Sequence, residues 1–364
     1  MTLPASRRPT LPSLRRALSG VLCAAALFAS GAGHALAEPK KKFDVCWTIY
    51  VGWMPWDYAV SSGIMKKWAD KYGIEVNVTQ LNDYIESINQ YTAGKFDACT
   101  MTNMDALTIP AASGVDSTAL IVGDYSNGND GITLKGKTEL KDIKGQRVNL
   151  VELSVSHYML ARALETAGLT EKDITIVNTS DADIVAAAAS PDVTALVSWK
   201  PQLAEINAMP GMTEVFNSSK IPGEILDMMV VNTQTLKDNP DLGKALVGAW
   251  YEVMALVEKK DPATLEAMAR ASGTDVAGFE SQLATTKLFV SAAEAVAFTS
   301  SADFPALMKK VADFSFAHGL FGEGAQSVDA IGIEYAGGAT QGDAANLKLR
   351  FPTEYMQMAA EGGL

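Results

Sequence analysis

Hydrophobic and polar residues alternate between two periods along most of the chain, and this pattern predicts an α/β protein. Short apolar runs typical of buried strands are followed by stretches in which apolar residues recur every three or four positions, as on one face of a helix. Strands that alternate with helices are typical of mostly parallel sheets covered by helices. Strands are predicted over Asp44–Tyr50, Ile74–Gln80, Phe96–Thr100, Thr118–Val122, Arg147–Val151, Ile174–Asn178, Val193–Val197 and Met228–Asn232.

Helices are predicted between these strands and through most of the C-terminal part. The first begins near Pro55, because proline suits the first turn of a helix. Four residues at four-residue steps would form its buried face: Val60, Ile64, Trp68 and Tyr72. Further helices are expected over Tyr84–Ala93, Met104–Ala112, Ser156–Ala167, Asp183–Ala189, Ala245–Lys259, Ala263–Ala271 and Pro305–His318. The tail from about Tyr335 is predicted to be rich in loops.

A turn-rich stretch, Ser126–Gly131, divides the chain into two α/β units. The chain is expected to cross between two lobes near Asn129–Gly131 and to return near Val231–Thr233. The pattern therefore predicts a first lobe made of residues 38–129 and 233–364, and a second lobe made of residues 130–232. The length is sufficient for two lobes, because single cores stop growing at about 250–300 residues.

The first 37 residues have the order of a secretory signal. Four arginines without any acid come first, the apolar stretch Ala17–Phe28 follows, and small residues end at Ala37. The apolar stretch is too short for a stable membrane span, which disfavours the alternative of an uncleaved anchor. We therefore expect export to the periplasm with cleavage near Ala37.

Charge narrows the classes of partner. The full chain has 30 Lys and Arg and 42 Asp and Glu, for a net charge of −12. The predicted signal holds four of the basic residues and no acid, so the mature chain would carry −16. Such a surface repels nucleic acid, which requires clustered Lys and Arg to neutralise phosphates. It also disfavours anionic membranes, and no nucleic-acid partner is expected.

Two cysteines, Cys46 and Cys99, follow the signal, each in an apolar run predicted to be a buried strand. An oxidising compartment permits a disulfide. Because residues on neighbouring strands rarely meet the geometry of a bridge, two separate buried thiols are the expected state. No metal is expected, since neither His157 nor His318 lies near a cysteine in the sequence. No cofactor is expected, because Walker and dinucleotide glycine patterns are absent.

Three pieces of the chain occur in an order and spacing found together in one protein group. They are Trp47–Trp68, then Thr92–Ala98, then a later part with Leu140–Val148, Ala186-Ala187 and Val193–Pro201. Residues 43–235 thereby resemble the nitrate, sulfonate, taurine and thiamine-precursor group of ABC-importer binding proteins. The resemblance implies a two-lobed periplasmic binding protein fold of type II, with two crossing segments and a helical C-terminal part. It also implies a solute held between the lobes, a monomer, and delivery to an ABC transporter permease in the inner membrane.

The ligand is expected at the ends of the strands, because open α/β sheets bind ligands outside the carboxyl ends of their strands. The candidate ligand-binding residues there are Trp53, Trp56, Asp57, Asp83, Thr102, Asn103, Asp124, Glu152, Ser154, Trp199 and Glu224. These segments are rich in aromatic and acidic residues and contain almost no cation, although a sulfonate or nitrate site would need basic groups or bare helix N-termini. Buried carboxylates without partners are costly, so the composition favours a cationic ligand.

The chain also resembles the branch of this group that is associated with urea carboxylase, which implies urea, guanidine or a related small nitrogen compound. Guanidinium suits both clues: it stacks on flat rings, and its N–H edges pair with carboxylates. A sulfonate such as taurine, or another small organic solute, remains the alternative ligand.

Several candidates have a structural explanation that competes with a role in binding. Asp57 suits the first turn of a helix, where the helix dipole favours an acid. Asp83 suits the N-cap of the helix that follows it. Trp199 could belong to the core of the second lobe, and Glu224 could lie on the surface. His157 is expected to be a first-turn helix residue rather than a catalytic base.

Catalysis is not expected. The segment Glu152–His157 brings hydroxyls and an imidazole together, which keeps an exported hydrolase as an alternative. It lacks the Gly-x-Ser-x-Gly elbow, however, and neighbours in sequence need not share triad geometry. A ligand-binding lobe of a sensor is a third possibility, which would need a membrane-attached partner domain.

Overall fold

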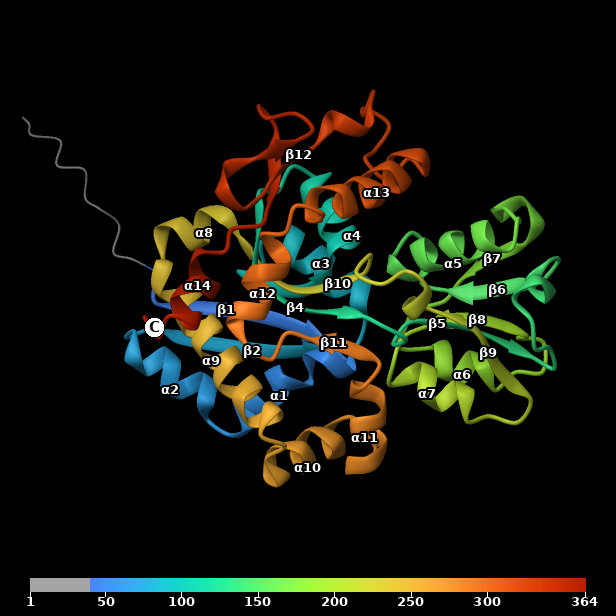
Figure 1. The fold of residues 1–364 in the computed structure, drawn as a ribbon, viewed down its shortest axis with the longest axis horizontal. Coiled ribbons are helices and arrows are strands. Elements are labelled where there is room, and N and C mark those ends of the chain that lie inside the picture. Colours follow the sequence, from blue (N-terminus) through green and yellow to red (C-terminus); the bar gives the residue numbers. More distant parts are fainter. Residues whose placement is uncertain (1–39) are drawn as a thin grey trace, which may run out of the picture. The chain divides into compact units, whose positions relative to one another are not determined.

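The computed structural model describes residues 40–364, and the predictions made for residues 1–37 lie outside this range. Two sheets organise the described residues (Figure 1). Among these residues, no helix combines the length and apolar character that a membrane crossing requires.

The first sheet belongs to the first lobe and mixes parallel and antiparallel strands. Its order is β13-β12-β14-β4-β10-β3-β1-β2, and β11 pairs with β4 beside this path. The strands are β1 (Lys42–Thr48), β2 (Glu75–Leu81), β3 (Ala98–Thr102), β4 (Ser117–Ser126), β10 (Leu226–Asn232), β11 (Thr286–Leu288), β12 (Gly332–Glu334), β13 (Thr340–Gln341) and β14 (Leu347–Arg350). The parallel pairs β1–β2 and β1–β3 bring the ends of these strands to one edge, beside the second lobe.

The second sheet forms the second lobe in the order β7-β6-β8-β5-β9. Its strands are β5 (Gly131–Lys135), β6 (Arg147–Leu150), β7 (Thr175–Asn178), β8 (Ala195–Ser198) and β9 (Met212–Asn217). Strands β6, β7 and β8 are parallel, whereas β5 runs antiparallel to both of its neighbours. The sequence pattern did not predict β5 or β9, and these two provide the antiparallel part of the sheet.

Helices cover both sheets (Figure 1). In the second lobe, α5 lies on one face of the sheet and α6 and α7 lie on the other. The helices are α1 (Met54–Ser61), α2 (Ile64–Lys71), α3 (Tyr84–Thr92), α4 (Asn103–Ala106), α5 (Val155–Thr166), α6 (Ile184–Ala188), α7 (Gln202–Asn207), α8 (Thr233–Asp238), α9 (Pro240–Glu258), α10 (Pro262–Ala271), α11 (Val276–Leu283), α12 (Ala292–Thr299), α13 (Phe304–Ala317) and α14 (Glu354–Ala360). Short 3-10 helices are η1 (Val51–Trp53), η3 (Leu140–Ile143), η4 (Glu171–Asp173), η5 (Ser218–Lys220), η6 (Val328–Ala330) and η7 (Ala336–Gly338), and η2 (Leu107–Ala111) is a π-helical turn.

The chain crosses between the sheets twice. The first crossing lies between β4 and β5, in the predicted stretch Ser126–Gly131. The second lies between β9 and β10, over residues 218–225, because all of β10 already belongs to the first sheet. The predicted return near Val231–Thr233 is therefore wrong in position. The predicted boundary at 129/130 lies in the first crossing, whereas the predicted boundary at 232/233 lies at the end of β10, beyond the second crossing.

The first predicted helix is interrupted. Gly63 adopts a left-handed conformation with φ of 80°, which ends α1 and starts α2. Glycine takes this conformation without the steric cost that other residues pay. The interruption turns the end of α1 outward, so Val60 is 47% exposed although the four-residue spacing predicted it to be buried. Ile64 is buried, as predicted.

The C-terminal part contains more strands than the sequence pattern predicted. Strand β14 pairs with β4 in parallel and with β12, so residues from the predicted loop-rich tail extend the first sheet. The chain then ends in α14. These strands are only two to four residues long, and runs of that length give almost no periodic signal.

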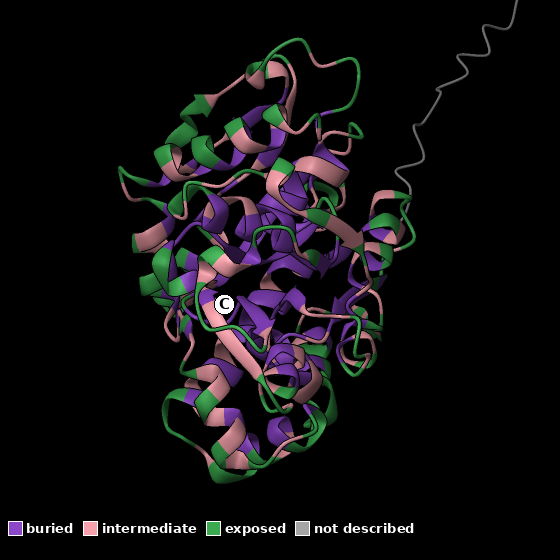
Figure 2. Ribbon diagram, turned by 90° about the vertical axis from the view of Figure 1, so that its right-hand side faces the viewer, coloured by how far each residue is buried: buried purple, intermediate pink, exposed green. Residues whose placement is uncertain are grey.

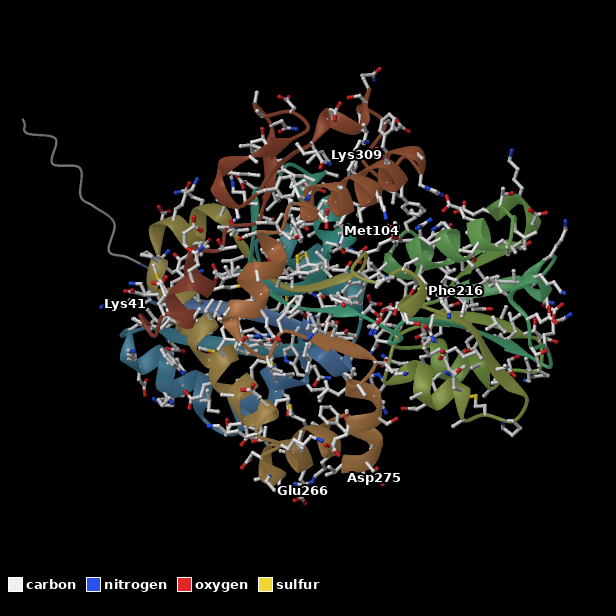
Figure 3. The ribbon with its side chains drawn as sticks, viewed as in Figure 1. Lys41, Met104, Phe216, Glu266, Asp275 and Lys309 are labelled. Atoms are coloured by element: carbon white, nitrogen blue, oxygen red, sulfur yellow. A yellow bond between two sulfur atoms is a disulfide. The ribbon has the colours of Figure 1, made fainter. Side chains whose placement is uncertain are left out.

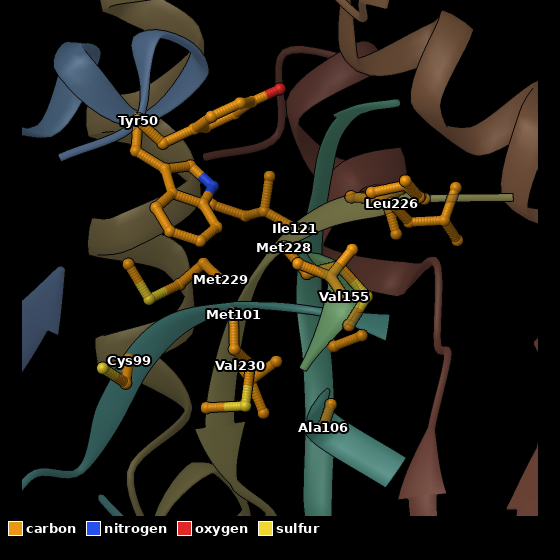
Figure 4. Packing of buried hydrophobic residues seen from close by; sticks show 14 of the residues in the cluster. Tyr50, Cys99, Met101, Ala106, Ile121, Val155, Leu226, Met228, Met229 and Val230 are labelled. Atoms are coloured by element: carbon orange, nitrogen blue, oxygen red, sulfur yellow. The ribbon is translucent and has the colours of Figure 1, made fainter. Parts of the chain in front are cut away.

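A large apolar core lies under these elements and surrounds the strands of the first sheet (Figure 2). Figure 4 shows part of it, where Met101 of β3, Ile121 of β4 and Met228 of β10 pack together. The prediction of two separate thiols in this core is wrong: Cys46 and Cys99 form a disulfide. The two are directly paired on the parallel strands β1 and β3, with their Cα atoms 4.4 Å apart, at the lower end of the range for such bridges.

Candidate ligand-binding site

A small cavity lies between the two lobes, where the predicted strand ends meet. Its volume is about 10 Å³, which is room for about one water molecule. The lining residues come from both lobes and from both crossings: Tyr50, Trp53, Tyr84, Thr102, Asp130, Val155, Trp199, Ile225 and Asp227. Side chains from both sheets fill the surrounding region (Figure 3). A solute larger than a water molecule therefore requires the walls of the cavity to move apart.

Four aromatic rings form one wall of the cavity. The centroids of Tyr50 and Trp53 lie 5.1 Å apart with the rings edge to face, and those of Trp53 and Tyr84 lie 6.0 Å apart. Trp199, from the end of β8 in the second lobe, meets Tyr84 edge to face at 5.5 Å. Aromatic faces of this kind attract cations through the ring quadrupole. The wall is complete only when the two lobes are together.

Two carboxyls face each other across the strands β4 and β10. The register of this antiparallel pair places Asp124 directly opposite Asp227. The hydroxyl of Tyr50 donates a hydrogen bond to Asp124 Oδ1 at 2.8 Å. Gly52 allows this approach, since a Cβ there would lie 2.6 Å from Asp124 Oδ2. Both carboxyls are fully buried, and Asp227 lines the cavity itself.

Two more buried carboxyls stand at the cavity or next to its walls. Asp130, in the first crossing, accepts a hydrogen bond from the Ser126 hydroxyl at 2.5 Å. Asp105 accepts hydrogen bonds from the hydroxyls of Tyr84, at 2.7 Å, and Thr102, at 2.9 Å. Tyr84 and Thr102 both line the cavity, so Asp105 sets the orientation of two wall residues from behind.

Burial raises the pKa of every one of these carboxyls. The pKa of Asp124 rises to about 7, and those of Asp105 and Asp130 rise to about 6. For Asp227, burial together with the charges on Asp124 and Asp130 places the pKa well above its usual value. The cause is the loss of water around the ionised form. At pH 7, Asp124 is therefore close to half protonated, Asp105 and Asp130 are mostly ionised, and burial favours the protonated form of Asp227.

Several acceptor oxygens at this site lack a hydrogen-bond partner. They are Asp105 Oδ1, Asp124 Oδ2 and Asp227 Oδ2. None of the residues that line the cavity is a lysine or an arginine. The nearby Lys200 donates from its Nζ to the Thr285 hydroxyl at 3.1 Å. Buried acceptors without donors are costly, so the arrangement is suited to a ligand that brings N–H donors and positive charge.

The structure brings some of the predicted site residues together. Trp53, Thr102 and Trp199 line the cavity, and Asp124 stands directly behind Asp227. The Trp199 indole also donates to the backbone oxygen of Ile49 at 3.1 Å, which ties the second lobe to the first.

Other predicted residues lie outside the cavity. Trp56 is buried in the first lobe, where it packs against Trp250 at 5.2 Å between ring centroids. Asp57 lies in the first turn of α1. Asp83 caps α3 by accepting from the Glu86 amide at 2.9 Å, which agrees with its structural explanation.

Two further candidates belong to the start of α5. Glu152 is exposed, and it lines a separate, more open space that it shares with Asp83. Ser154 is the N-cap of α5, where its hydroxyl accepts from the Ser156 amide.

Glu224 and Asn103 hold the lobes against each other rather than lining the cavity. The carboxylate of Glu224, in the second crossing, accepts from Tyr158 at 2.6 Å and from Arg162 Nε at 2.8 Å, both on α5. Lys310 of α13 in the first lobe reaches the same carboxylate at 3.3 Å. Asn103 donates to the Glu224 backbone oxygen at 3.1 Å. The lobes are thus in contact, which corresponds to a closed form.

Six cavity residues were not among the predicted site residues: Tyr50, Tyr84, Asp130, Val155, Ile225 and Asp227. Tyr50 follows β1, and Asp130 lies in the first crossing. Both positions follow the end of a strand, where ligand-binding residues are expected. Asp227 stands near the start of β10, an antiparallel strand. The strand-end rule for parallel sheets does not cover that position.

Two β-sheets covered by helices, two crossings and a cavity between the lobes define the class of fold. It is the two-lobed fold of the periplasmic solute-binding proteins. Within that class, the chain belongs to the NMT1/THI5-like family, whose model matches residues 63–263, more than half of the 364 residues.

Solved structures and curated relatives are similar to this chain at low identity. The alkanesulfonate-binding protein of Xanthomonas axonopodis pv. citri has a TM-score of 0.66 at 17% identity, covering 79% of this chain and 96% of that one. The nitrate-binding protein of Synechocystis PCC 6803 has a TM-score of 0.64 at 11% identity, covering 89% of each chain. The taurine-binding periplasmic protein of Escherichia coli is 26% identical over 164 residues, 42% of this chain and 50% of the relative. A Brucella abortus protein named as a binding protein is 21% identical over 225 residues, 61% of this chain and 70% of its own.

Proposed function

We propose that this chain is the periplasmic solute-binding component of an ABC importer and that it closes around guanidinium or a closely related small nitrogen compound. The observation that carries the proposal is the wall of the cavity. Buried carboxyls with unpartnered oxygens meet four aromatic rings there, without a lysine or arginine among the lining residues.

A planar cation satisfies both parts of this wall. Its N–H edges would donate to Asp227 and Asp130, which line the cavity, and charge-assisted hydrogen bonds of this kind are stronger than neutral ones. Its face would stack on Trp53 or Trp199, with each such contact worth about 0.5–2 kcal/mol. A urea molecule offers similar donors without the charge, so it would leave the carboxylates uncompensated and is expected to bind more weakly.

A sulfonate or nitrate ligand remains the second candidate because relatives are named for such ligands. An anion in this cavity would approach carboxyls at close range. It would bind only with those groups protonated, and it would find the tyrosine and tryptophan donors rather than a basic side chain. The charge of the lining residues therefore favours the cation.

Capture is expected to proceed by closure of the lobes about the two crossings, at residues 127–130 and 218–225. Hinge closure around ligands is common in periplasmic binding proteins. The solute shifts the balance toward the closed form by its differential affinity for that form. In the closed form it would contact Trp199 and Asp130 as well as Trp53 and Asp227. The closed protein would then be the form presented to a permease, as a monomer.

A thermal-shift screen tests the ligand class. Ligand-free mature protein is mixed with guanidinium, methylguanidine, urea, taurine, an alkanesulfonate and nitrate, with sodium chloride at equal ionic strength as the control. A ligand that binds only the folded form raises the melting temperature as its concentration increases. The proposal predicts the largest rise for guanidinium or its methyl derivative. A rise with taurine or nitrate and none with the nitrogen compounds would refute it.

Small-angle scattering tests closure. A saturating solute that binds in the cavity should reduce the radius of gyration, because the lobes approach each other. An unchanged radius at saturation would contradict hinge closure and leave the ligand class to the thermal-shift result.

A further inference from the structure

A second cluster of side chains joins the lobes outside the cavity. His157 of α5 and Glu171 of η4, both in the second lobe, meet His318, which follows α13 in the first lobe. Nε2 of His157 lies 3.0 Å from Glu171 Oε1, and Nε2 of His318 lies 2.8 Å from the same oxygen. One nitrogen from each histidine and this oxygen all lie within 4.8 Å of one another.

We propose that His157, Glu171 and His318 form a binding site for a divalent transition metal such as Zn²⁺. The bound ion would stabilise the contact between the two lobes. Zinc is commonly held by three protein ligands of this kind, imidazole nitrogens and a carboxylate oxygen, with water in a fourth position. The bonds are about 2.0–2.2 Å long, so three donor atoms already within a few ångströms of one another need only small shifts to surround the ion. Because the ligands come from two lobes, the movement of one lobe can supply these shifts.

The surroundings of His318 suit a metal ligand. Its Nδ1 donates to the backbone oxygen of Phe314 at 2.9 Å, so Nε2 is the nitrogen that faces Glu171. Such a bond from the second ring nitrogen to a carbonyl fixes the orientation of metal-binding histidines. The Phe314 ring stacks on the imidazole at 4.0 Å between centroids and limits its rotation further.

His157 is held differently. The backbone amide of Leu153 donates to its Nδ1 at 3.1 Å, which places the ring proton on Nε2. A metal at Nε2 requires this proton to leave and Nδ1 to be protonated, so the Leu153 amide must turn toward water. Leu153 is 47% exposed, so this turn borders solvent. We therefore expect His157 to contribute less to metal affinity than His318 and Glu171.

The position of the cluster gives the metal a regulatory effect. An ion bound to all three side chains has higher affinity for the closed form, since His318 belongs to the first lobe and its two partners to the second. Coupling between two sites is reciprocal, so zinc should raise solute affinity by the factor by which solute raises zinc affinity, about 5- to 150-fold. This coupling rests on the proposed function, whereas zinc binding itself does not.

Zinc titration by calorimetry tests the site. Of the three histidines, His34 lies in the predicted signal, so mature protein without a tag offers imidazole ligands only from His157 and His318. One zinc ion per chain should bind, His318→Ala and Glu171→Gln should each weaken binding at least tenfold, and His157→Ala should weaken it less. The matched control is Glu266→Gln, an exposed carboxylate on α10, at the opposite side of the first lobe from Lys309 of α13 (Figure 3).

Three results would overturn the proposal. They are failure of the wild-type chain to bind zinc, unchanged affinity in both His318→Ala and Glu171→Gln, and an equal loss in Glu266→Gln. Scattering with zinc alone tests separately whether the ion favours the closed form. The radius of gyration should fall in the wild-type chain and stay unchanged in His318→Ala. A wild-type radius unaffected by bound zinc would contradict the closed-form preference. These measurements need no solute, so they succeed or fail independently of the guanidinium proposal.

Discussion

The substitution Asp227→Asn separates the two roles that the buried carboxyls have in this account. Asp227 lines the cavity, is 3% exposed and has an unpartnered oxygen. Burial and the neighbouring charges hold its pKa well above the usual value, which favours the protonated form in the solute-free protein. An amide has nearly the shape of a protonated carboxyl and can donate to Asp124. It cannot ionise when a cation enters.

The expected loss of affinity follows from this single lost charge. Hydrogen bonds to charged groups contribute about 1.5–3 kcal/mol. Since about 1.4 kcal/mol corresponds to a factor of ten, Asp227→Asn should weaken guanidinium binding roughly 10- to 150-fold. The stability of the solute-free protein should change by less than about 1 kcal/mol, because the variant removes no buried contact and adds no charge.

Calorimetric titration and thermal denaturation measure the two quantities on the same preparations. Asp57→Asn is the matched control, because Asp57 is a partly buried aspartate in the first turn of α1 and does not line the cavity. Guanidinium affinity should be unchanged in this control. Equal affinities in wild-type protein and Asp227→Asn would refute the role of the buried carboxyls, as would a loss of the same size in Asp57→Asn.

Four further predictions follow from the site and its supports. Guanidinium binding should weaken as the pH falls through about 7, because the raised pKa of Asp124 means that the cation must displace a proton from this carboxyl. Calorimetry in buffers of different ionisation enthalpy should detect the released proton. The solute-free protein should lose stability as the pH rises from about 4 to about 7, because the pKa of Asp124 is higher in the folded than in the unfolded protein and the folded form is favoured while this carboxyl keeps its proton. Denaturation that shows the opposite trend would contradict this prediction. Replacing Cys46 and Cys99 by serine should lower the free energy of unfolding by about 4 kcal/mol, because the bridge closes a separation of 53 residues, and an unchanged denaturant midpoint would contradict the bridge. Glu224→Gln should weaken solute binding about tenfold and enlarge the radius of gyration in scattering, and an unchanged affinity and radius would contradict the role of this carboxylate.

The sequence predicted those site residues whose positions depend on one strand at a time. Residues at the ends of β1, β3 and β8 were expected at the site, and Trp53, Thr102 and Trp199 line the cavity. Their positions follow from local periodicity and from a general rule about strand ends.

The remaining parts depend on which strands become neighbours. Asp227 meets Asp124 because β10 pairs with β4, and Cys46 meets Cys99 because β1 pairs with β3 in a given register. The sequence pattern indicates that a strand is buried, but it carries no information about its partner or register. For the same reason, Asp83 could not be assigned to a cap rather than to the cavity until the start of α3 was fixed.

The short elements were also beyond the reach of periodicity. Strand β14 has four residues, and its place beside β4 is set by tertiary contacts that come from the far end of the chain. Strands β5 and β9 lie far apart in the sequence, so their antiparallel pairing is a tertiary contact. The sequence therefore predicted the position of the first crossing, after β4, but not that of the second crossing, between β9 and β10.

The central claim is that the space between the lobes accepts a cation. Isothermal titration of ligand-free mature protein with guanidinium chloride, and separately with taurine, tests it most directly at a pH of about 8, where the cavity carboxyls are most readily ionised. The account predicts one guanidinium ion bound per chain, with protons released, and no heat of binding from taurine. Binding of taurine without a response to guanidinium would contradict it.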